Sequence, residues 1–190
     1  MIAQSVNGLR IEQDELSPHR YLQRDWQPQE GSIVADIGTA EGNFSLDIVE
    51  RVRKLYLFEC DPGWVEALQA TFAPWKEKVE IVTQYIGNGK GCIALDTYFK
   101  DKEIDYIKAD IEGAEVAMLL GGKDTFSKQI SQAIICAYHR FDDEENIKSC
   151  LGLYGFDCEV SDGYMCFSYA DDFDRAYFRR GLVYGKKQGE

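Results

Sequence analysis

The strongest constraint on the fold of this chain is the alternation of short β-rich runs with helical patterns after residue 31. Such alternation is typical of parallel strands joined by crossover helices. Strands are predicted at Ser32–Ile37, Lys54–Glu59, Val79–Thr83, Ile104–Ala109 and Gln132–Tyr138. Helices are predicted at Asn43–Arg53, Pro62–Phe72, Ala114–Leu120 and Asp142–Leu151. The chain is therefore expected to form an α/β fold, with the almost wholly apolar strand Gln132–Tyr138 inside the sheet.

The two ends of the chain depart from this alternation. Near the carboxyl end, β-rich runs at Phe156–Val160, Tyr164–Tyr169 and Ala176–Tyr184 have only turns between them, which predicts an antiparallel hairpin added to the parallel sheet. Near the amino end, a weak helical stretch over Glu12–Trp26 is interrupted by Pro18. We expect residues 1–31 to form a helical cap over the sheet edge or the mouth of a ligand site, and residues 32–190 to form one domain.

The charge of the chain restricts its partners. Asp and Glu number 33 against 21 Lys and Arg, a formal net charge of -12, so the long-range field repels phosphate backbones and nucleic acid is not expected as a partner. No apolar run approaches the roughly 20 residues that span a bilayer, and residues 1–11 do not read as a secretion signal. We therefore expect a soluble cytoplasmic protein without a membrane partner, whose six cysteines are reduced thiols.

A glycine turn follows the first predicted strand. It reads Asp36-Ile37-Gly38-Thr39-Ala40-Glu41-Gly42-Asn43-Phe44, a DxGxxxG pattern rather than the GxGxxG of dinucleotide enzymes. Gly38 permits close approach of the backbone to a ligand, and Gly42 lets the next helix begin beside that ligand with its amide donors. A purely structural role for both glycines is the alternative.

A carboxylate follows the second predicted strand at Glu59, about 20 residues past the glycine turn, where nucleotide-type α/β sites hold a ribose diol. Glu59 is the candidate ribose ligand. Asp61 precedes Pro62 and is interpreted as a helix N-cap.

Ionisable residues follow the fourth and fifth predicted strands. Asp110, Glu112 and Glu115 lie within six residues, an expensive grouping unless a cation or proton sits among them. Glu115 has a simpler interpretation, since acids in a first helical turn complement the helix dipole. His139 ends the fifth strand and is a candidate general base or metal ligand, whereas His19 is expected to be exposed.

These motifs resemble the FkbM family of methyltransferases. The resemblance rests on Val34–Gly38 with Gly42–Leu46, on Phe58–Pro62, and on Leu95–Tyr98 followed by the Asp105–Glu115 run that contains Asp-Ile-Glu-Gly-Ala-Glu. It implies a class I, Rossmann-like methyltransferase: a three-layer sandwich around a mostly parallel seven-stranded sheet, using S-adenosyl-L-methionine (SAM). The implied cofactor-binding residues are Asp36, Gly38, Thr39, Gly42, Asn43, Phe44, Glu59, Cys60 and Asp110. No acid follows the third strand at Thr83-Gln84-Tyr85, so no adenine ligand is predicted.

The resemblance further implies O-methylation of a hydroxyl on a small molecule or sugar, and no oligomeric state is predicted. An alcohol needs a base or a metal to lower its pKa, and Asp110, Glu112 and His139 are predicted to carry this chemistry. Metal-free base catalysis is favoured, with magnesium or manganese on the same three residues as the alternative. A catalytically inactive SAM-binding module and an NAD-dependent oxidoreductase are the competing functions.

Overall fold

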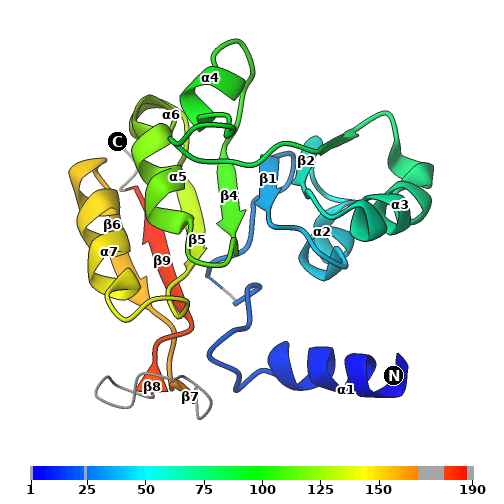
Figure 1. The fold of residues 1–190 in the computed structure, drawn as a ribbon, viewed down its shortest axis with the longest axis horizontal. Helices are drawn as coiled ribbons and strands as arrows, with labels where there is room; N and C mark the ends of the chain where they lie inside the picture. The colour runs from blue at the N-terminus through cyan, green and yellow to red at the C-terminus, as the bar shows by residue number, and fades with distance from the viewer. Residues whose placement is uncertain (1, 24, 167–177, 188–190) are drawn as a thin grey trace.

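The computed structural model describes residues 2–23, 25–166 and 178–187. Seven strands form one sheet in the order β3-β2-β1-β4-β5-β9-β6, and two short strands form a second sheet (Figure 1). The helices are α1 (Ile2–Glu12), α2 (Asn43–Ile48), α3 (Pro62–Thr71), the 3-10 helix η1 (Ala73–Trp75), α4 (Leu95–Tyr98), α5 (Glu115–Gly121), α6 (Lys123–Lys128) and α7 (Asp143–Leu153). The strands are β1 (Ile33–Ile37), β2 (Lys54–Phe58), β3 (Val79–Val82), β4 (Tyr106–Ala109), β5 (Gln132–Cys136), β6 (Asp157–Val160), β7 (Met165–Cys166), β8 (Phe178–Arg179) and β9 (Leu182–Lys186).

The predicted parallel core of the sheet is confirmed. β1 pairs in parallel with β2 and β4, β2 with β3, and β4 with β5. Every residue of β1, β4 and β5 is buried, as apolar strands covered on both faces require. The carboxyl ends of these strands therefore meet at one edge of the sheet.

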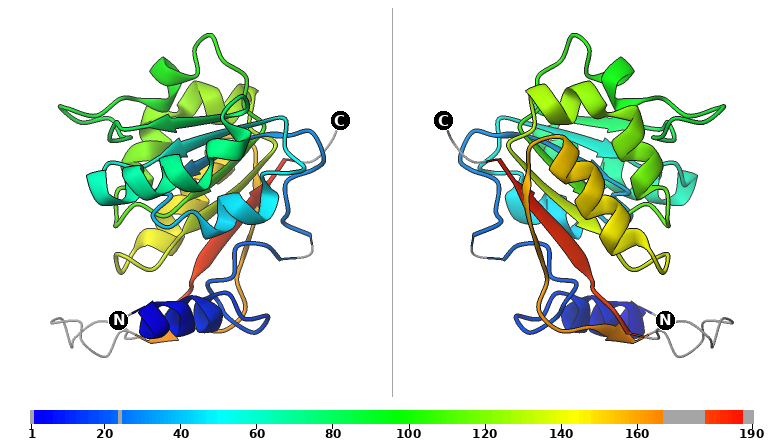
Figure 2. Two further views of the ribbon diagram at one scale, coloured as in Figure 1. Left: turned by 90° about the vertical axis from the view of Figure 1, so that its right-hand side faces the viewer. Right: turned by 90° about the vertical axis from the view of Figure 1, so that its left-hand side faces the viewer.

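Helices cover both faces of the sheet and make three layers (Figure 2). One core contains Leu95, Met118, Phe126 and Ile147 from helices α4 to α7. The other core contains Phe44 and Leu68 from α2 and α3, together with Tyr21 from the N-terminal segment. The expected Rossmann-like sandwich is thus confirmed.

The carboxyl end adds antiparallel pairing, as predicted, but divides it differently. β9 lies between β5 and β6 and runs antiparallel to both, while β7 and β8 form the separate two-stranded sheet. The single run predicted at Ala176–Tyr184 is wrong for its described part, because β8 and β9 are separate strands with Arg180 and Gly181 between them. Parts of this run and of Tyr164–Tyr169 lie outside the described residues.

The N-terminal segment differs from the sequence prediction. Its helix is α1, which ends at Glu12, and the stretch predicted to be helical from Glu12 to Trp26 forms turns and irregular backbone in its described part. A Cβ at Gly181 would collide with the main-chain oxygen of Pro18, so this loop packs tightly against the start of β9. The loop after α1 passes the edge of the sheet where the parallel strands end (Figure 1). Pro18, which cannot continue a helix, is part of this loop.

The structure also describes the cysteines and the length of the helices. All six cysteines lie in the described part of the chain and none forms a disulfide. Among the described residues, no helix has the length and apolar character needed to span a bilayer.

Candidate active site

The glycine turn after β1 lies against the end of β4. Gly38 has a φ of 75°, and a Cβ there would collide with the main-chain oxygen of Asp110. Gly42 has a φ of 81°, and a Cβ there would press on Leu68 and Phe72 of the α3 region. Both positions thus need glycine for structural reasons, and Gly38 brings the loop after β1 into contact with the loop after β4.

A buried ion pair between Lys108 and Asp36 stabilises this turn. Lys108 Nζ lies 2.9 Å from Asp36 Oδ1 and donates to the carbonyl oxygen of Gly38 at 2.8 Å. Ser45 Oγ donates to the other Asp36 oxygen at 2.7 Å. Burial raises the pKa of Asp36 although Lys108 opposes this, and the Lys108 pKa is raised because Asp36 and Asp110 outweigh its own burial. The Asp36 carboxylate therefore serves to hold the glycine turn in place.

A cleft of about 390 Å³ opens along the carboxyl ends of the first four strands. Glu59 lies on its wall, where Oε2 accepts from the Ala40 amide at 2.8 Å and Oε1 accepts from the amides of Cys60 and Asp61 at 2.7 and 2.8 Å. Asp61 Oδ1 accepts from the Gly63 amide at 2.8 Å and caps α3 as predicted. The Glu59 carboxylate is consequently fixed in place by three amides.

The predicted cofactor residues divide into two groups. Four of them line the cleft: Gly38, Glu59, Cys60 and Asp110. Five do not belong to that lining: Asp36, Thr39, Gly42, Asn43 and Phe44. Thr39 Oγ1 donates to the Asp36 carbonyl at 2.9 Å, and Phe44 packs in the core. These five residues therefore lie outside the cleft lining and support the glycine turn.

Two aromatic side chains of the cleft were not predicted. Trp64 of α3 is 43% exposed and Tyr85, after β3, is 68% exposed, and both line the cleft. Their sequence surroundings carry no motif. The available sequence signal was a tryptophan in the first turn of the helix that follows Glu59, the predicted ribose ligand.

The structure brings together Asp110, Glu112 and His139, as predicted. His139 Nε2 lies 3.3 Å from Asp110 Oδ1 and 3.6 Å from Glu112 Oε2. Glu112 has a φ of 55°, unusual for a residue with a side chain, and its side chain is 92% exposed. Glu112 and Asp110 line the cleft, whereas His139 lies just behind them with 9% of its side chain exposed.

Glu115 does more than complement a helix dipole. It begins α5 as expected, but it is fully buried, and its Oε1 accepts from the Ile111 amide at 2.9 Å and lies 3.0 Å from His139 Nδ1. Burial lowers the pKa of His139, but the carboxylates of Glu115 and Asp110 outweigh it and hold that pKa above its ordinary value. Glu115 therefore orients the imidazole.

The expectation that His19 is exposed is wrong. His19 is 3% exposed, and its Nε2 lies 3.4 Å from Asp110 Oδ2 and 3.5 Å from Cys136 Sγ. Tyr21 donates to the same Asp110 oxygen at 2.7 Å, and Tyr138 donates to the Asp110 carboxylate at 3.2 Å. The sequence predicted a cap over the sheet edge but missed this arrangement, because it placed His19 in an exposed, helical stretch rather than in a loop packed against the strand ends.

The environment of Asp110 keeps it ionised. Burial acts to raise the Asp110 pKa, but the pairing with His19 and the nearby Lys108 outweigh burial and hold that pKa well below its usual range. A permanently charged carboxylate between two imidazoles can orient them, accept hydrogen bonds from a ligand, or bind a cation.

Comparison with known proteins gives the class to which this fold belongs. FkbM methyltransferase from Methylobacillus flagellatus KT superposes with a TM-score of 0.64 at 16% identity, covering 84% of this chain and 44% of that one. A putative tRNA (m1A22) methyltransferase from Streptococcus pneumoniae superposes with a TM-score of 0.57 at 15% identity, covering 85% of this chain and 67% of that one. A putative methyltransferase from Streptococcus mutans, in complex with S-adenosylhomocysteine (SAH), gives 0.50 at 14% identity, covering 84% and 90%. The fold is that of the Rossmann-like methyltransferases.

The family is indicated by the sequence as well. Residues 90–180, slightly less than half of the chain, match the family model of the methyltransferase FkbM domain. This match and the shared fold confirm the resemblance to FkbM methyltransferases. The chain spans less than half the length of the Methylobacillus flagellatus protein. No curated protein sequence matches the chain.

Proposed function

We propose that this protein is a SAM-dependent methyltransferase that methylates a hydroxyl group on a small molecule or sugar. The observation that carries the proposal is one continuous cleft that joins Glu59, at the end of β2, to Asp110 and Glu112, after β4. Ligands of open α/β sheets bind outside the carboxyl ends of the strands, and this cleft lies there. The Streptococcus mutans neighbour, which shares the fold, was solved with SAH.

The two ends of the cleft suit the two ends of SAM. Each carboxylate oxygen has two lone pairs, so after its three amides Glu59 keeps one lone pair, on Oε2, to accept from a ribose hydroxyl. The exposed rings of Trp64 and Tyr85 offer apolar surface for adenine. The methionine end would then pass the Gly38 turn toward Asp110.

The chemistry assigned to His139 is proton removal from the acceptor hydroxyl. Methyl transfer from a sulfonium is an in-line displacement, so the protein must align the acceptor oxygen with the methyl group and exclude water. Glu115 faces Nδ1 and favours the tautomer with its proton there, which leaves Nε2 of neutral His139 to accept a proton. Once Nε2 takes up the proton, Asp110 stabilises the imidazolium, and Glu112 borders the acceptor.

A divalent metal is the alternative way to activate the hydroxyl. Asp110, Glu112 and His139 offer two carboxylates and an imidazole, a donor set that suits magnesium or manganese. If such a metal acts, chelation abolishes turnover and magnesium restores it, whereas base catalysis by His139 survives chelation followed by removal of the chelator.

The charge of the chain supports a small acceptor over RNA, although one fold neighbour is a putative tRNA methyltransferase. A net charge of -12 repels a phosphate backbone unless a basic surface compensates. We therefore propose a small hydroxylated acceptor.

Calorimetric titration with SAM, SAH and NAD tests the cofactor assignment. SAM and SAH should bind and NAD should not. Glu59→Ala should weaken SAM binding by about 1–3 kcal/mol, because hydrogen bonds to a charged group are lost. Glu66→Ala, the same change at an exposed residue of α3, is the matched control and should bind normally. Wild-type affinity in Glu59→Ala removes Glu59 from the site, and binding of NAD alone overturns the proposal.

A further inference from the structure

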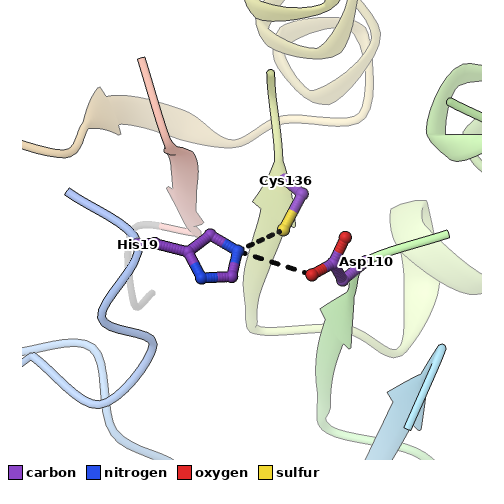
Figure 3. A group of neighbouring side chains, drawn as sticks. All are labelled: His19, Asp110 and Cys136. Atoms are coloured by element: carbon purple, nitrogen blue, oxygen red, sulfur yellow. Dashed lines mark hydrogen bonds and ion pairs between the residues drawn. The ribbon is translucent and has the colours of Figure 1, made fainter. Parts of the chain in front are cut away.

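Four donor atoms from three distant segments meet on the side of Asp110 that faces away from His139. They are His19 Nε2 and the Tyr21 hydroxyl from the N-terminal loop, Asp110 Oδ2 after β4, and Cys136 Sγ at the end of β5. Figure 3 shows one nitrogen of the His19 ring facing both the cysteine sulfur and an aspartate oxygen. One atom from each of His19, Asp110 and Cys136 lies within 4.8 Å of the others.

The two separations that involve His19 Nε2 are those found around a tetrahedral metal ion. Zinc bonds sulfur at about 2.3 Å and nitrogen or oxygen at about 2.0–2.2 Å, so tetrahedral angles place sulfur roughly 3.6 Å from nitrogen and nitrogen roughly 3.4 Å from oxygen. The separation from His19 Nε2 is 3.5 Å to Cys136 Sγ and 3.4 Å to Asp110 Oδ2. The three protein donors therefore need little movement to share one ion.

The kind of donor selects the kind of metal. A thiolate and an imidazole are ligands for zinc and for other late first-row metals, whereas magnesium and calcium prefer oxygen alone. The Tyr21 hydroxyl supplies a further oxygen for the fourth coordination position of a tetrahedral ion. It lies 3.2 Å from His19 Nε2 and 4.0 Å from Cys136 Sγ. The donor set is thus distinct from the oxygen-rich group of Asp110, Glu112 and His139.

The outer contacts of His19 support the same assignment. Histidines that bind metals through one ring nitrogen usually direct the other at a carboxylate or carbonyl. His19 Nδ1 lies 2.9 Å from Glu12 Oε1, at the end of α1. His19 and Cys136 are 3% and 0% exposed, so a bound ion would be shielded from water.

We propose that His19, Asp110 and Cys136 form a zinc site that fastens the N-terminal loop to the ends of β4 and β5. Binding replaces the proton of the Cys136 thiol by the metal, and that proton leaves to solvent. Asp110 Oδ1 stays directed at His139, 3.3 Å away, so the metal would fix the carboxylate that also orients the candidate base. This inference does not rest on the proposed acceptor or on methyl transfer.

Cobalt substitution tests the site in the intact protein. Protein stripped with a chelator should bind about one Co²⁺ per chain, with the near-ultraviolet absorption of a thiolate–cobalt bond and the intense visible bands of tetrahedral coordination. Zinc should displace the cobalt, and an excess of magnesium should not. Absence of thiolate absorption in wild-type protein overturns the proposal whatever the variants do.

Variants assign the ligands. Cys136→Ala should lose the thiolate absorption, and His19→Gln should weaken cobalt binding at least 100-fold. Glu12→Gln should weaken it by about 10- to 100-fold, as expected for an outer partner. Cys92→Ala, which changes an exposed thiol, is the matched control and should bind normally. Circular dichroism verifies that each variant is folded, and the wild-type measurement stands if one is not.

Two outcomes contradict the proposal. Thiolate absorption that persists in Cys136→Ala and disappears in Cys92→Ala assigns the binding to a surface cysteine. Cobalt binding that survives in Cys136→Ala but is lost in His139→Gln assigns the metal to Asp110, Glu112 and His139 instead.

Discussion

The two sides of Asp110 differ in exposure and in the origin of their partners. On the open side, Oδ1 lies 3.3 Å from His139, which in turn contacts Glu112, a residue with 92% of its side chain exposed. On the closed side, Oδ2 accepts from Tyr21 at 2.7 Å and faces His19, which is 3% exposed. One carboxylate thus has a side that ligands can reach and a side fixed within the protein.

This difference separates two tasks of the same residue. A group that handles protons or ligands must be accessible and able to exchange partners. A group that positions another must be held by neighbours that do not move. The open side meets the first requirement and the closed side meets the second.

Removing the imidazole of the open side should have the largest effect. His139→Ala should lower the single-turnover rate of methyl transfer by about 10²- to 10⁴-fold, the usual range for loss of a general base. SAM affinity should change little, because His139 does not line the cofactor cleft. Rapid mixing with an accepted hydroxyl substrate measures the rate, and calorimetry measures the affinity.

Glu112→Gln is the companion variant for this prediction, since it removes a charge from the open side while leaving the imidazole in place. A rate in His139→Ala within threefold of wild type would mean that His139 is structural. The acceptor base would then have to be sought in another residue.

A collision at Gly38 should disturb both sides together, because this residue packs against the main chain of Asp110. Gly38→Ala adds a Cβ that meets the Asp110 carbonyl oxygen, at a φ of 75° that disfavours a side chain. We expect a loss of about 3 kcal/mol in the free energy of unfolding. Urea denaturation measures it. Gly89→Ala, at a position with open space for a Cβ, should change stability by less than about 1 kcal/mol.

The two tyrosines that donate to Asp110 allow a matched comparison in metal-free protein. Tyr21→Phe removes a 2.7 Å bond made by a residue that is 7% exposed, and should cost about 1.5–3 kcal/mol of unfolding free energy. Tyr138→Phe removes longer bonds, of 3.2 and 3.3 Å, from a half-buried residue and should cost about 1 kcal/mol. Equal losses in thermal or urea unfolding would mean that the bond from Tyr21 stabilises the fold no more than the longer bonds from Tyr138.

The open side could be predicted from the sequence, and the closed side could not. Asp110, Glu112 and Glu115 are close in the chain, and His139 follows the strand that pairs with β4, so strand order alone brings them together. His19 and Cys136 are separated by 117 positions, and their meeting depends on a loop without a regular pattern. No hydrophobic periodicity in the sequence indicates that this loop is buried.

The fold shows the same division. The βα alternation predicted the parallel strands because each needs an apolar run and a crossover. The position of β9 between β5 and β6 depends on pairing across the whole sheet. Among the predicted cofactor residues is Asp36, yet its partners Lys108 and Ser45 come from separate elements and hold it behind the glycine turn.

The smallest expected effect on stability comes from Glu80, a carboxylate that belongs to neither side of Asp110. Its titration with acid serves as a reference for Asp110. Glu80 on β3 accepts from Tyr98 at 2.7 Å and pairs with Lys102 and Lys54 at 2.9 and 3.2 Å. Burial acts to raise its pKa, but these three partners outweigh burial and lower it from 4.5 to about 2.

A lowered pKa in the folded state means that the ionised Glu80 stabilises the fold above its unfolded pKa of 4.5, and that this contribution is lost as the pH falls toward about 2. The side chain is 38% exposed, so solvent screening limits the contribution to less than about 1 kcal/mol. The unfolding free energies of wild type and Glu80→Gln should therefore keep a constant gap above about pH 5 and approach one another as the pH falls from 4.5 toward 2, as measured by urea denaturation. A gap in unfolding free energy that stays constant over this lower range would show that Glu80 contributes through packing. Glu80 could then not serve as the charged surface carboxylate with which Asp110 is compared.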